Sequence, residues 1–246
     1  MKNIIYVIAA LSASAGLNAA ASTPSYSITS DFTYASEYIF RGVANAGNSF
    51  QPSLEFTQGD LSLGLWTSQP VTKHENNEID LYGSYGYKVS NALKLEGIVT
   101  SYNYPEAGGG QTKNSIEGGL GATFTAGAFS PSVYYYYDFK LKANTLQGAV
   151  GYSLPLEAIG TSVDTSIYIG SVDARDTAPD AAGPAVRESY GYYGVDVSVP
   201  YKLSSNATWT IAGHYAENRN LAGVGGPTGT LGKRNLWFTT GISIGF

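Results

Sequence analysis

The chain has 246 residues and a formal net charge of −5, and only 13% of its residues are charged. Soluble domains usually carry about a quarter charged residues, so the composition is unusual for that class. The chain has no cysteine, which excludes a disulfide framework, a thiolate nucleophile and a thiolate metal site.

The first residues form a short basic start, an apolar run over 4–11 and then a series of small residues. This order is typical of a secretory signal peptide, and we expect cleavage after Ala21. The alternative is a membrane anchor, but the apolar run is far shorter than the roughly 20 residues that span a bilayer. We therefore expect a signal peptide over 1–21 and a single domain over 22–246.

From residue 26 onward, apolar and polar residues alternate in segments of about ten, which Gly, Pro, Asn and Asp separate. Such alternation predicts strands with one apolar and one polar face. We count twelve strands, near 26–36, 50–57, 61–68, 78–88, 93–104, 115–124, 129–139, 145–154, 162–173, 190–199, 207–216 and 236–246. The pattern predicts an all-β fold, a transmembrane antiparallel up-and-down β-barrel of about 12 strands, with 10–14 as the range.

The connections between these strands alternate in kind. The short set is 58–60, 89–92, 125–128, 155–161 and 200–206. The longer and more polar set is 37–49, 69–77, 105–114, 174–189 and 217–234, with 140–144 as a short exception. Short periplasmic turns and longer outside loops are the asymmetry expected of an outer-membrane barrel.

Aromatic residues gather near the strand ends that would lie outside: Tyr34, Tyr38, Phe40, Phe50, Trp66, Tyr102, Tyr104, Tyr136, Tyr137 and Tyr215. They predict a girdle at the membrane–water interface. The alternative is that tyrosine simply favours strands.

The last predicted strand alternates strictly, with one apolar face made of Leu236, Phe238, Thr240, Ile242, Ile244 and Phe246. A soluble protein rarely exposes such an apolar edge, because unpaired edge strands aggregate. A closing strand that ends in Phe looks like those of outer-membrane barrels, in which it resembles the signal read by the barrel-assembly machinery. We therefore expect the bacterial outer membrane as the location and Phe246 as the assembly signal.

The segment Ala35-Ser36-Glu37-Tyr38-Ile39-Phe40-Arg41-Gly42 resembles the first motif of the TorF family of porins, exported proteins whose function is poorly defined. Gln51-Pro52-Ser53-Leu54, Asp80-Leu81-Tyr82-Gly83 and Tyr102-Asn103-Tyr104-Pro105 are also similar to that family. The resemblance covers the N-terminal half well and the remainder through the barrel pattern only. It implies an outer-membrane barrel of the porin type, and it brings no catalytic residues and no particular solute.

Residues opposite the apolar phase are predicted to face the lumen. They include eight acids, Asp31, Glu55, Asp80, Glu96, Glu117, Asp138, Asp164 and Asp196, against the bases Lys88 and Lys94, with Arg41 near the first loop. Acidic rings in a pore favour cations. We therefore hypothesise that these pore-lining residues give a weak cation preference. Alternatively, the charges pair with each other or lie in wide water and select nothing.

Inward aromatic residues are predicted to narrow the lumen: Trp66, Tyr82, Tyr134, Tyr136, Tyr168 and Tyr192. The path would then suit small solutes or be closed, and stacking of sugars or nucleosides on these rings is a further hypothesis. If the loop 37–49 or 174–189 folds into the lumen and packs against the inward acids, the channel is constricted or shut.

Catalysis has little support in the sequence. The chain has two histidines, His74 in a polar loop and His214 on an inward position. A Ser-His-Asp arrangement is recognised by its geometry and not by sequence order, and no segment is distinctive. We therefore expect no enzyme activity, no catalytic residues, no metal and no cofactor.

Three functional classes remain. The leading one is a porin-like channel for passive diffusion of small hydrophilic solutes. The others are a closed barrel that acts as a scaffold or adhesin through the loops 174–189 and 217–234, and a barrel enzyme. The expected partners are outer-membrane lipids and lipopolysaccharide, the barrel-assembly machinery and small solutes, with no nucleic acid, since there is no basic patch. The solute, the gating and the choice between monomer and trimer stay open.

Overall fold

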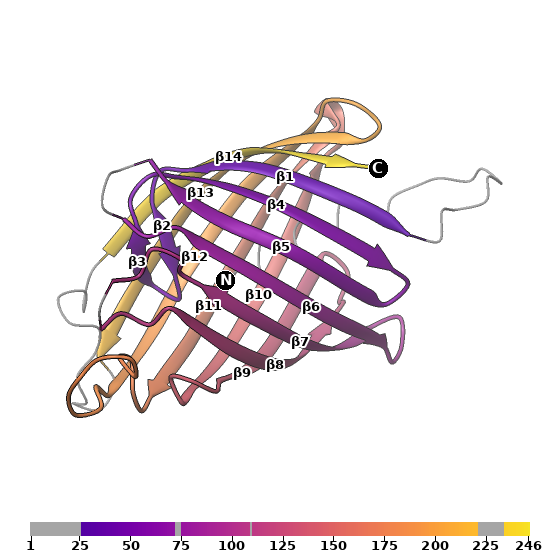
Figure 1. Cartoon of the computed structure of the whole chain (residues 1–246). Coiled ribbons are helices and arrows are strands. Elements are labelled where there is room, and N and C mark those ends of the chain that lie inside the picture. The colour runs from indigo at the N-terminus through magenta and orange to yellow at the C-terminus, as the bar shows by residue number, and fades with distance from the viewer. Residues whose placement is uncertain (1–25, 72–74, 109, 221–233) are drawn as a thin grey trace.

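The computed structural model describes residues 26–71, 75–108, 110–220 and 234–246. Twelve strands form a closed antiparallel barrel in the order β1-β14-β13-β12-β11-β10-β9-β8-β7-β6-β5-β4 (Figure 1). Their bounds are β1 Ser27–Ala35, β4 Ser49–Gln58, β5 Leu61–Pro70, β6 Glu78–Lys88, β7 Leu93–Asn103, β8 Asn114–Phe124, β9 Phe129–Asp138, β10 Ala143–Leu156, β11 Thr161–Ala174, β12 Glu188–Lys202, β13 Ala207–Asn220 and β14 Arg234–Gly245. The predicted twelve-stranded barrel is confirmed, while the predicted signal peptide lies outside the described residues.

The first and last strands of the barrel close the ring. Strand β1 pairs with β14 from Thr29 opposite Gly245 to Ala35 opposite Thr239. Beyond the last paired residue, the Phe246 N–H donates a hydrogen bond to the Ile28 carbonyl at 2.8 Å. A closed ring leaves no strand edge with unpaired backbone groups, which is the condition for β-strands to cross a bilayer.

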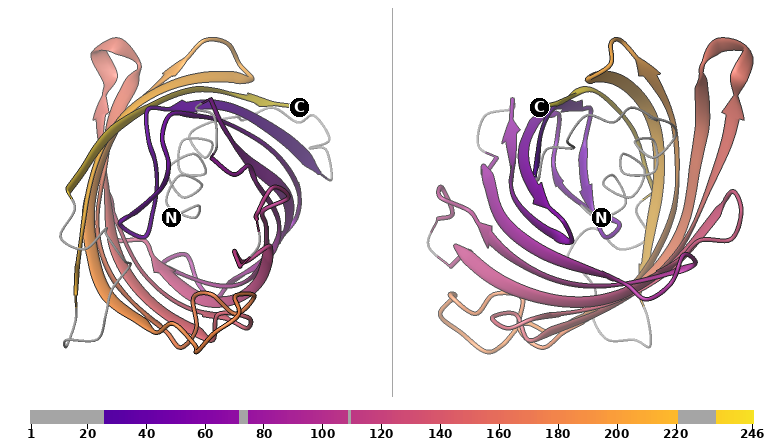
Figure 2. Two further views of the ribbon diagram at one scale, coloured as in Figure 1. Left: turned by 60° about the vertical axis from the view of Figure 1, so that its left-hand side comes forward. Right: turned by 90° about the vertical axis from the view of Figure 1, so that its right-hand side faces the viewer.

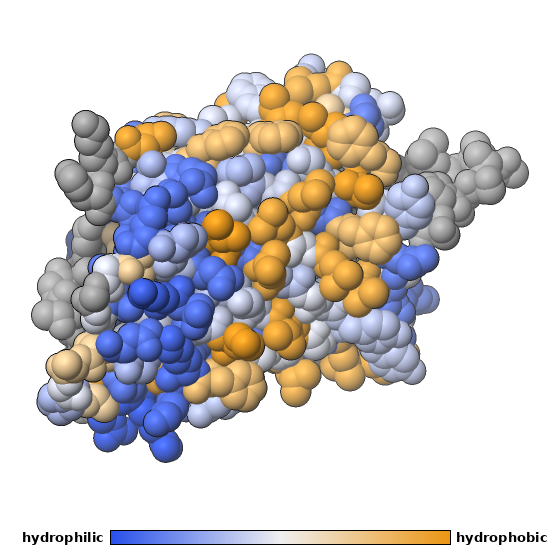
Figure 3. Space-filling model, viewed as in Figure 1, coloured by the Kyte–Doolittle hydropathy of each residue, from blue (hydrophilic) through white to orange (hydrophobic). Residues whose placement is uncertain are grey.

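The two faces of each strand differ as the alternation predicts. Large apolar side chains stand exposed on the outside, among them Leu120 at 69% and Leu236 at 81%. In Figure 3 apolar residues cover much of the barrel wall, while polar residues gather at the end that carries β2 and β3. Apolar residues exposed in this number suit contact with acyl chains and not with water.

The two ends of the barrel differ in the length of their connections. The turns 59–60, 89–92, 125–128, 157–160 and 203–206 lie at the end where β14 finishes, and the 3₁₀ turn η1 (Glu157–Ile159) belongs to this set. The longer links 36–48, 71–77, 104–113 and 175–187 lie at the other end, together with the short link 139–142. We call them the turn end and the loop end. No helix among the described residues is long and apolar enough to span a membrane.

The predicted loop 37–49 holds two strands that the alternation did not predict. Strands β2 (Tyr38–Phe40) and β3 (Val43–Ala46) pair with each other and with no strand of the barrel. Figure 2 shows this hairpin inside the ring of strands, so that it lies across the bore near the loop end. We call residues 38–46 the plug hairpin.

The predicted aromatic girdle is wrong for five of its members, because Phe40 of the plug hairpin and four other residues lie inside the barrel. Tyr38, Trp66, Tyr102 and Tyr136 are between 6% and 9% exposed and lie inside the barrel. Tyr38 belongs to the plug hairpin, and the other three are on inward positions of β5, β7 and β9. There Trp66 contacts Tyr38, Tyr102 contacts Phe40, and Tyr136 contacts Arg41 of the hairpin. Their position at the loop end is therefore explained by the plug and not by the membrane interface.

Candidate functional site

The tip of the plug hairpin is a tight turn made of Arg41 and Gly42. Both residues have positive φ angles, 51° and 78°, between the paired residues Phe40 and Val43. Two central residues with positive φ define the type I′ turn, whose twist matches that of the flanking strands. Glycine adopts this conformation freely, but at Arg41 it costs on the order of 1–3 kcal/mol. The surroundings of Arg41 must therefore hold it in place.

Arg41 forms a two-pronged ion pair with Glu117 of β8. The guanidinium nitrogens donate to the two carboxylate oxygens at 2.7 and 2.8 Å, and both side chains are less than 10% exposed. Such a paired fork combines charge with fixed geometry and is among the stronger contacts of a protein. The Tyr102 hydroxyl donates a third hydrogen bond to Glu117 at 3.0 Å. This contact, which we call the latch, joins the tip of the hairpin to the wall.

Aromatic rings cover the charged group of Arg41. The guanidinium carbon lies 4.7 Å from the centre of the Phe40 ring and 5.0 Å from that of Tyr136. A guanidinium over ring faces at these distances gains a cation–π attraction, which grows as water is excluded. The latch is therefore both paired and shielded.

The opposite wall also binds the tip. The Gly42 carbonyl accepts hydrogen bonds from the side-chain amides of Asn218 on β13, at 2.6 Å, and Asn235 on β14, at 3.2 Å. A Cβ added to Gly42 would lie 2.8 Å from the Cβ of Tyr192 on β12, which is closer than real side chains approach. A glycine is thus required at the tip by space as well as by its φ angle.

The flanks of the hairpin are apolar and pack on several strands. Ile39 lies in a buried cluster with Ala216 of β13 and Trp237 of β14. Tyr38 packs at 5.3 Å, ring centre to ring centre, on Trp66 of β5. Since β8, which holds Glu117, lies on the opposite side of the ring from β14, the hairpin bridges the bore. The structure therefore shows a barrel that is constricted at its loop end.

The predicted pore-lining acids lie on the inner face of the wall, where each occupies a particular environment. Three of them lie toward the loop end. Glu117 is part of the latch, and Asp80 is fully buried. Asp138 accepts hydrogen bonds from the backbone N–H groups of Lys140 and Leu141 at the β9–β10 turn. The sequence analysis placed Arg41 near the first loop, and the structure places it at the tip of the hairpin within that loop.

The other five acids lie further toward the turn end and accept hydrogen bonds from neighbouring side chains. Their partners are Ser53 for Asp31, Tyr82 for Glu55, Tyr134 and Lys94 for Glu96, Ser153 for Asp164, and His214 for Asp196. Hydroxyl donors leave the charge of a carboxylate in place. Glu117 and Glu96 also have a basic partner, Arg41 and Lys94 respectively.

The two lysines predicted to face the lumen lie at its turn end. Lys94 Nζ is 3.2 Å from Glu96 and its side chain is 54% exposed. Lys88 is exposed and pairs with Lys94 across β6 and β7. Both therefore lie at the mouth of the lumen, away from the plug hairpin.

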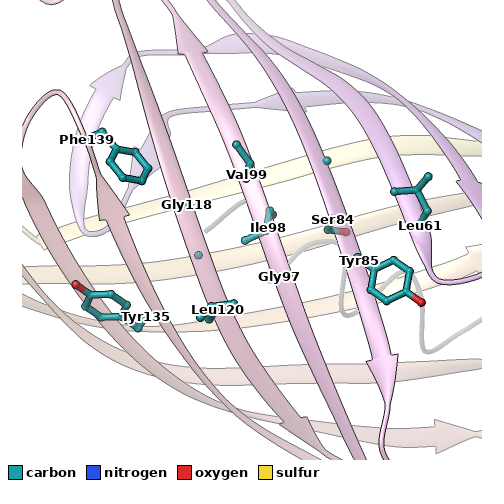
Figure 4. Close-up of a pocket in the computed structure, with 12 residues that line it drawn as sticks. Leu61, Ser84, Tyr85, Gly97, Ile98, Val99, Gly118, Leu120, Tyr135 and Phe139 are labelled. Carbon is teal, nitrogen blue, oxygen red and sulfur yellow. The ribbon is translucent and has the colours of Figure 1, made fainter.

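A shallow apolar groove of about 600 Å³ lies on the outer face of the barrel (Figure 4). Its lining includes Leu61, Tyr85, Val99 and Leu120, which are large apolar residues on outward positions. Gly83, Gly97 and Gly118 lie between these residues, and because they have no side chain they leave the space that forms the groove. The groove faces the acyl chains and does not open to the lumen residues described above. Within the described residues, no group of three acidic or histidine side chains is placed to hold a metal ion.

Comparison with known proteins gives one family match. Residues 18–130 match the model of a family described as "Bacterial protein of unknown function (Gcw_chp)". No curated protein matches the chain. The matched segment includes the plug hairpin and the latch residue Glu117.

Solved structures share the barrel fold. The COG4313 outer membrane channel from Pseudomonas putida F1 matches with a TM-score of 0.54 and 11% identity, over 94% of this chain and all of that chain. The KdgM porin matches at 0.53 and 14%, over 89% and 99%, and LpxR from Salmonella typhimurium at 0.53 and 8%, over 88% and 99%. At these identities the likeness shows the fold alone, which is that of outer-membrane channels and related barrels.

Proposed function

We propose that this barrel is an outer-membrane channel for small hydrophilic solutes, whose plug hairpin closes the loop end in the state described above. The observation that carries the proposal is the Arg41–Glu117 latch, which ties a chain segment across the bore to the wall. A polar, acid-lined inner face below the plug and a fold shared with porins support it. Opening then consists of releasing the latch and moving the hairpin.

Planar-bilayer conductance of the refolded protein tests this function. We expect rare or small current steps from the natural chain, and larger steps once the plug is weakened. If neither the natural chain nor the variants with a weakened plug conduct ions or let small sugars swell liposomes, the barrel is not a channel.

We further propose a weak cation preference. The residues predicted to line the lumen are eight acids and three bases, and most of these acids accept hydrogen bonds from neutral hydroxyl groups, which leave their charge in place. Fixed negative charge in a narrow pore raises the local concentration of cations. The KdgM porin has been solved in complex with oligogalacturonate, a chain of acidic sugars. The charge on this inner wall disfavours such an anion, so neutral or cationic solutes are the better substrates here.

The reversal potential in a KCl gradient measures this preference. We expect the sign that indicates cation selectivity, and a shift toward zero in the variant with Asp31→Asn and Glu55→Gln, because two fixed charges of the inner wall are then removed. The matched control is Asp173→Asn, which removes an acid from an exposed outward position of β11. Anion selectivity, or a reversal potential that the double variant leaves unchanged, would contradict the proposal.

The closed plug also supports one competing function, a scaffold or adhesin that acts through its external loops. Loop 175–187 is tied to the β9–β10 turn, because Lys140 Nζ lies 2.7 Å from Asp180. The hydrogen bond from Lys140 lowers the pKa of Asp180 from its ordinary value. An ordered outer loop suits recognition, and a barrel that stays non-conducting without its plug would favour this function.

Location and assembly complete the proposal. We place the chain in the bacterial outer membrane, in contact with lipopolysaccharide and other lipids, because its outer face is apolar and its fold is that of outer-membrane barrels. We propose that Phe246 serves the barrel-assembly machinery, since it ends the closing strand and is 73% exposed. Membership of the TorF family belongs to the same proposal and rests on the motif that contains Arg41 and Gly42.

A further inference from the structure

Three lumen-facing side chains form a hydrogen-bonded row across neighbouring strands below the plug. Asp196 of β12 lies 2.7 Å from Nδ1 of His214 on β13, and Nε2 of His214 lies 3.0 Å from the hydroxyl of Thr239 on β14. Asp196 and His214 are directly opposite each other in the strand register, and Thr239 is opposite Ala212. The three residues thus come from strands that the closed barrel places side by side.

With Asp196 as a carboxylate and His214 as a neutral imidazole, the direction of each hydrogen bond follows. An ionised carboxylate can only accept, so the His214 Nδ1–H donates to Asp196. In a neutral imidazole the other nitrogen is then an acceptor, and the Thr239 hydroxyl donates to it. A hydroxyl, a neutral imidazole and an orienting carboxylate in this order are the groups of a Ser-His-Asp hydrolase, which is defined by geometry on unrelated folds.

An aromatic ring packs against this row, and a buried tyrosine hydroxyl without a hydrogen-bond partner among the described residues lies nearby. The His214 ring stacks on Trp237 with 4.9 Å between ring centres and 15° between planes. The plug residue Ile39 packs with Ala216 and Trp237. His214 and Thr239 lie two residues further toward the turn end on the same strands, so the row lies on the turn-end side of the plug. Tyr168 is 1% exposed, and its hydroxyl, which has no hydrogen-bond partner among the described residues, lies against Gly194, two residues before Asp196.

We propose that Asp196, His214 and Thr239 form a hydrolytic site for short carboxylic esters inside the barrel. The Thr239 oxygen attacks the ester carbonyl while its proton passes to His214 Nε2. The tetrahedral intermediate then expels the alcohol, which takes that proton, and leaves an acyl group on Thr239. Water attacks this second ester with His214 again as the base, which releases the carboxylic acid and restores the hydroxyl.

The position of the site limits the substrate. The row lies on the lumen face, so a water-soluble ester reaches it from the turn end without crossing the plug. The inner wall of the neighbouring strand β11 carries Asp164, and strand β1, which pairs with β14, carries Asp31. These acids disfavour an anionic substrate and favour a neutral or cationic one. This activity goes beyond conduction and does not depend on it.

The test uses the refolded full-length barrel in detergent with p-nitrophenyl acetate as the probe. We expect hydrolysis and, by peptide mass spectrometry of the natural chain, an acetyl adduct on Thr239. Thr239→Ala and His214→Gln are expected to lower the rate by about 10²-fold, the usual contribution of a positioned base. Thr239→Ser keeps the nucleophile, so it should hydrolyse the probe and react with a fluorophosphonate.

Two variants separate chemistry from structure. Thr240→Ala is the matched control, because Thr240 is the next residue on β14 and its hydroxyl accepts a hydrogen bond from Trp209 on the outer face. It should hydrolyse the probe like the natural chain. Asp196 is a positioning residue, and Asp196→Asn should lower kcat with little change in KM.

The outcome is decisive in either direction. A rate in Thr239→Ala equal to that of the natural chain, with acetyl adducts on other residues only, would overturn the proposal. So would a natural chain that hydrolyses the probe no faster than Thr239→Ala. Because the assay is run in detergent, a channel that fails to conduct leaves this result unaffected, and an inactive site leaves the conductance result unaffected.

Discussion

Replacing Arg41 by alanine should greatly increase the conductance of the refolded barrel. The substitution removes both hydrogen bonds of the latch and both cation–π contacts, and it leaves the Glu117 carboxylate buried without its positive partner. Breaking a buried ion pair by removing one partner costs about 3–5 kcal/mol. This corresponds to at least about a 10²-fold shift from the docked toward the released hairpin, since each 1.4 kcal/mol is tenfold.

Single-channel recording in planar bilayers measures this effect as larger or more frequent current steps. The matched control is the double variant Arg41→Met with Glu117→Leu, which removes both charges of the latch and so leaves no unpaired charge at that contact. Replacing both members of a buried pair by apolar residues is often neutral or stabilising, so the double variant should conduct much less than Arg41→Ala. A folded Arg41→Ala barrel that conducts like the natural chain would show that the latch does not hold the plug.

The second large effect is expected at Gly42. Valine there must adopt a φ angle of 78° and would place its Cβ 2.8 Å from the Cβ of Tyr192. Neither strain can be relieved by a side-chain rotation, because one is in the backbone and the other involves a Cβ atom. The tip should therefore leave its position, lose the hydrogen bonds from Asn218 and Asn235, and open the bore.

The control for Gly42→Val is Gly59→Val in the β4–β5 turn. Gly59 also has a positive φ, 58°, but a Cβ there would meet nothing within 4 Å. The two variants share the backbone strain and differ in the clash with the wall. We expect an increase in conductance from Gly42→Val alone, and equal conductance in the two variants would mean that the tip does not block the path.

The alternation in the sequence predicted the barrel because a strand with one lipid face and one lumen face leaves a period of two in the chain. It located the inward positions as well, since parity is conserved along each strand. Asp31 and Phe32 illustrate this: the carboxylate bonds to Ser53 inside, and the ring is 46% exposed outside. Strand β13 extends to Asn220, beyond the predicted end at residue 216, because Glu217 and Asn218 continue the pairing with β12.

The sequence named loop 37–49 as one of two loops that would constrict or shut the channel if they packed against the inward acids, and the contact of Arg41 with Glu117 shows that this loop does so. The hairpin within the loop was not predicted, because its strands are too short to show a period. A signal was nevertheless present: two short apolar runs, Tyr38–Phe40 and Val43–Ala46, flank an Arg-Gly pair, which is a hairpin pattern with glycine at the second turn position. An external loop with Tyr38, Ile39 and Phe40 would expose them to water. The contact of Arg41 with Glu117 depends on how the loop folds. The contacts of His214 with Asp196 and Thr239 depend on the strand register. One sequence specifies neither.

The most direct test of the account is to remove the plug. Residues 38–46 are replaced by a short Gly-Ser linker, and the single-channel conductance of the refolded variant is compared with that of the natural chain in the same salt. If the hairpin closes the barrel, the variant conducts with clearly larger steps, because the contacts that span the bore from β5 and β8 to β13 and β14 are gone. A folded variant whose conductance equals that of the natural chain would contradict the account.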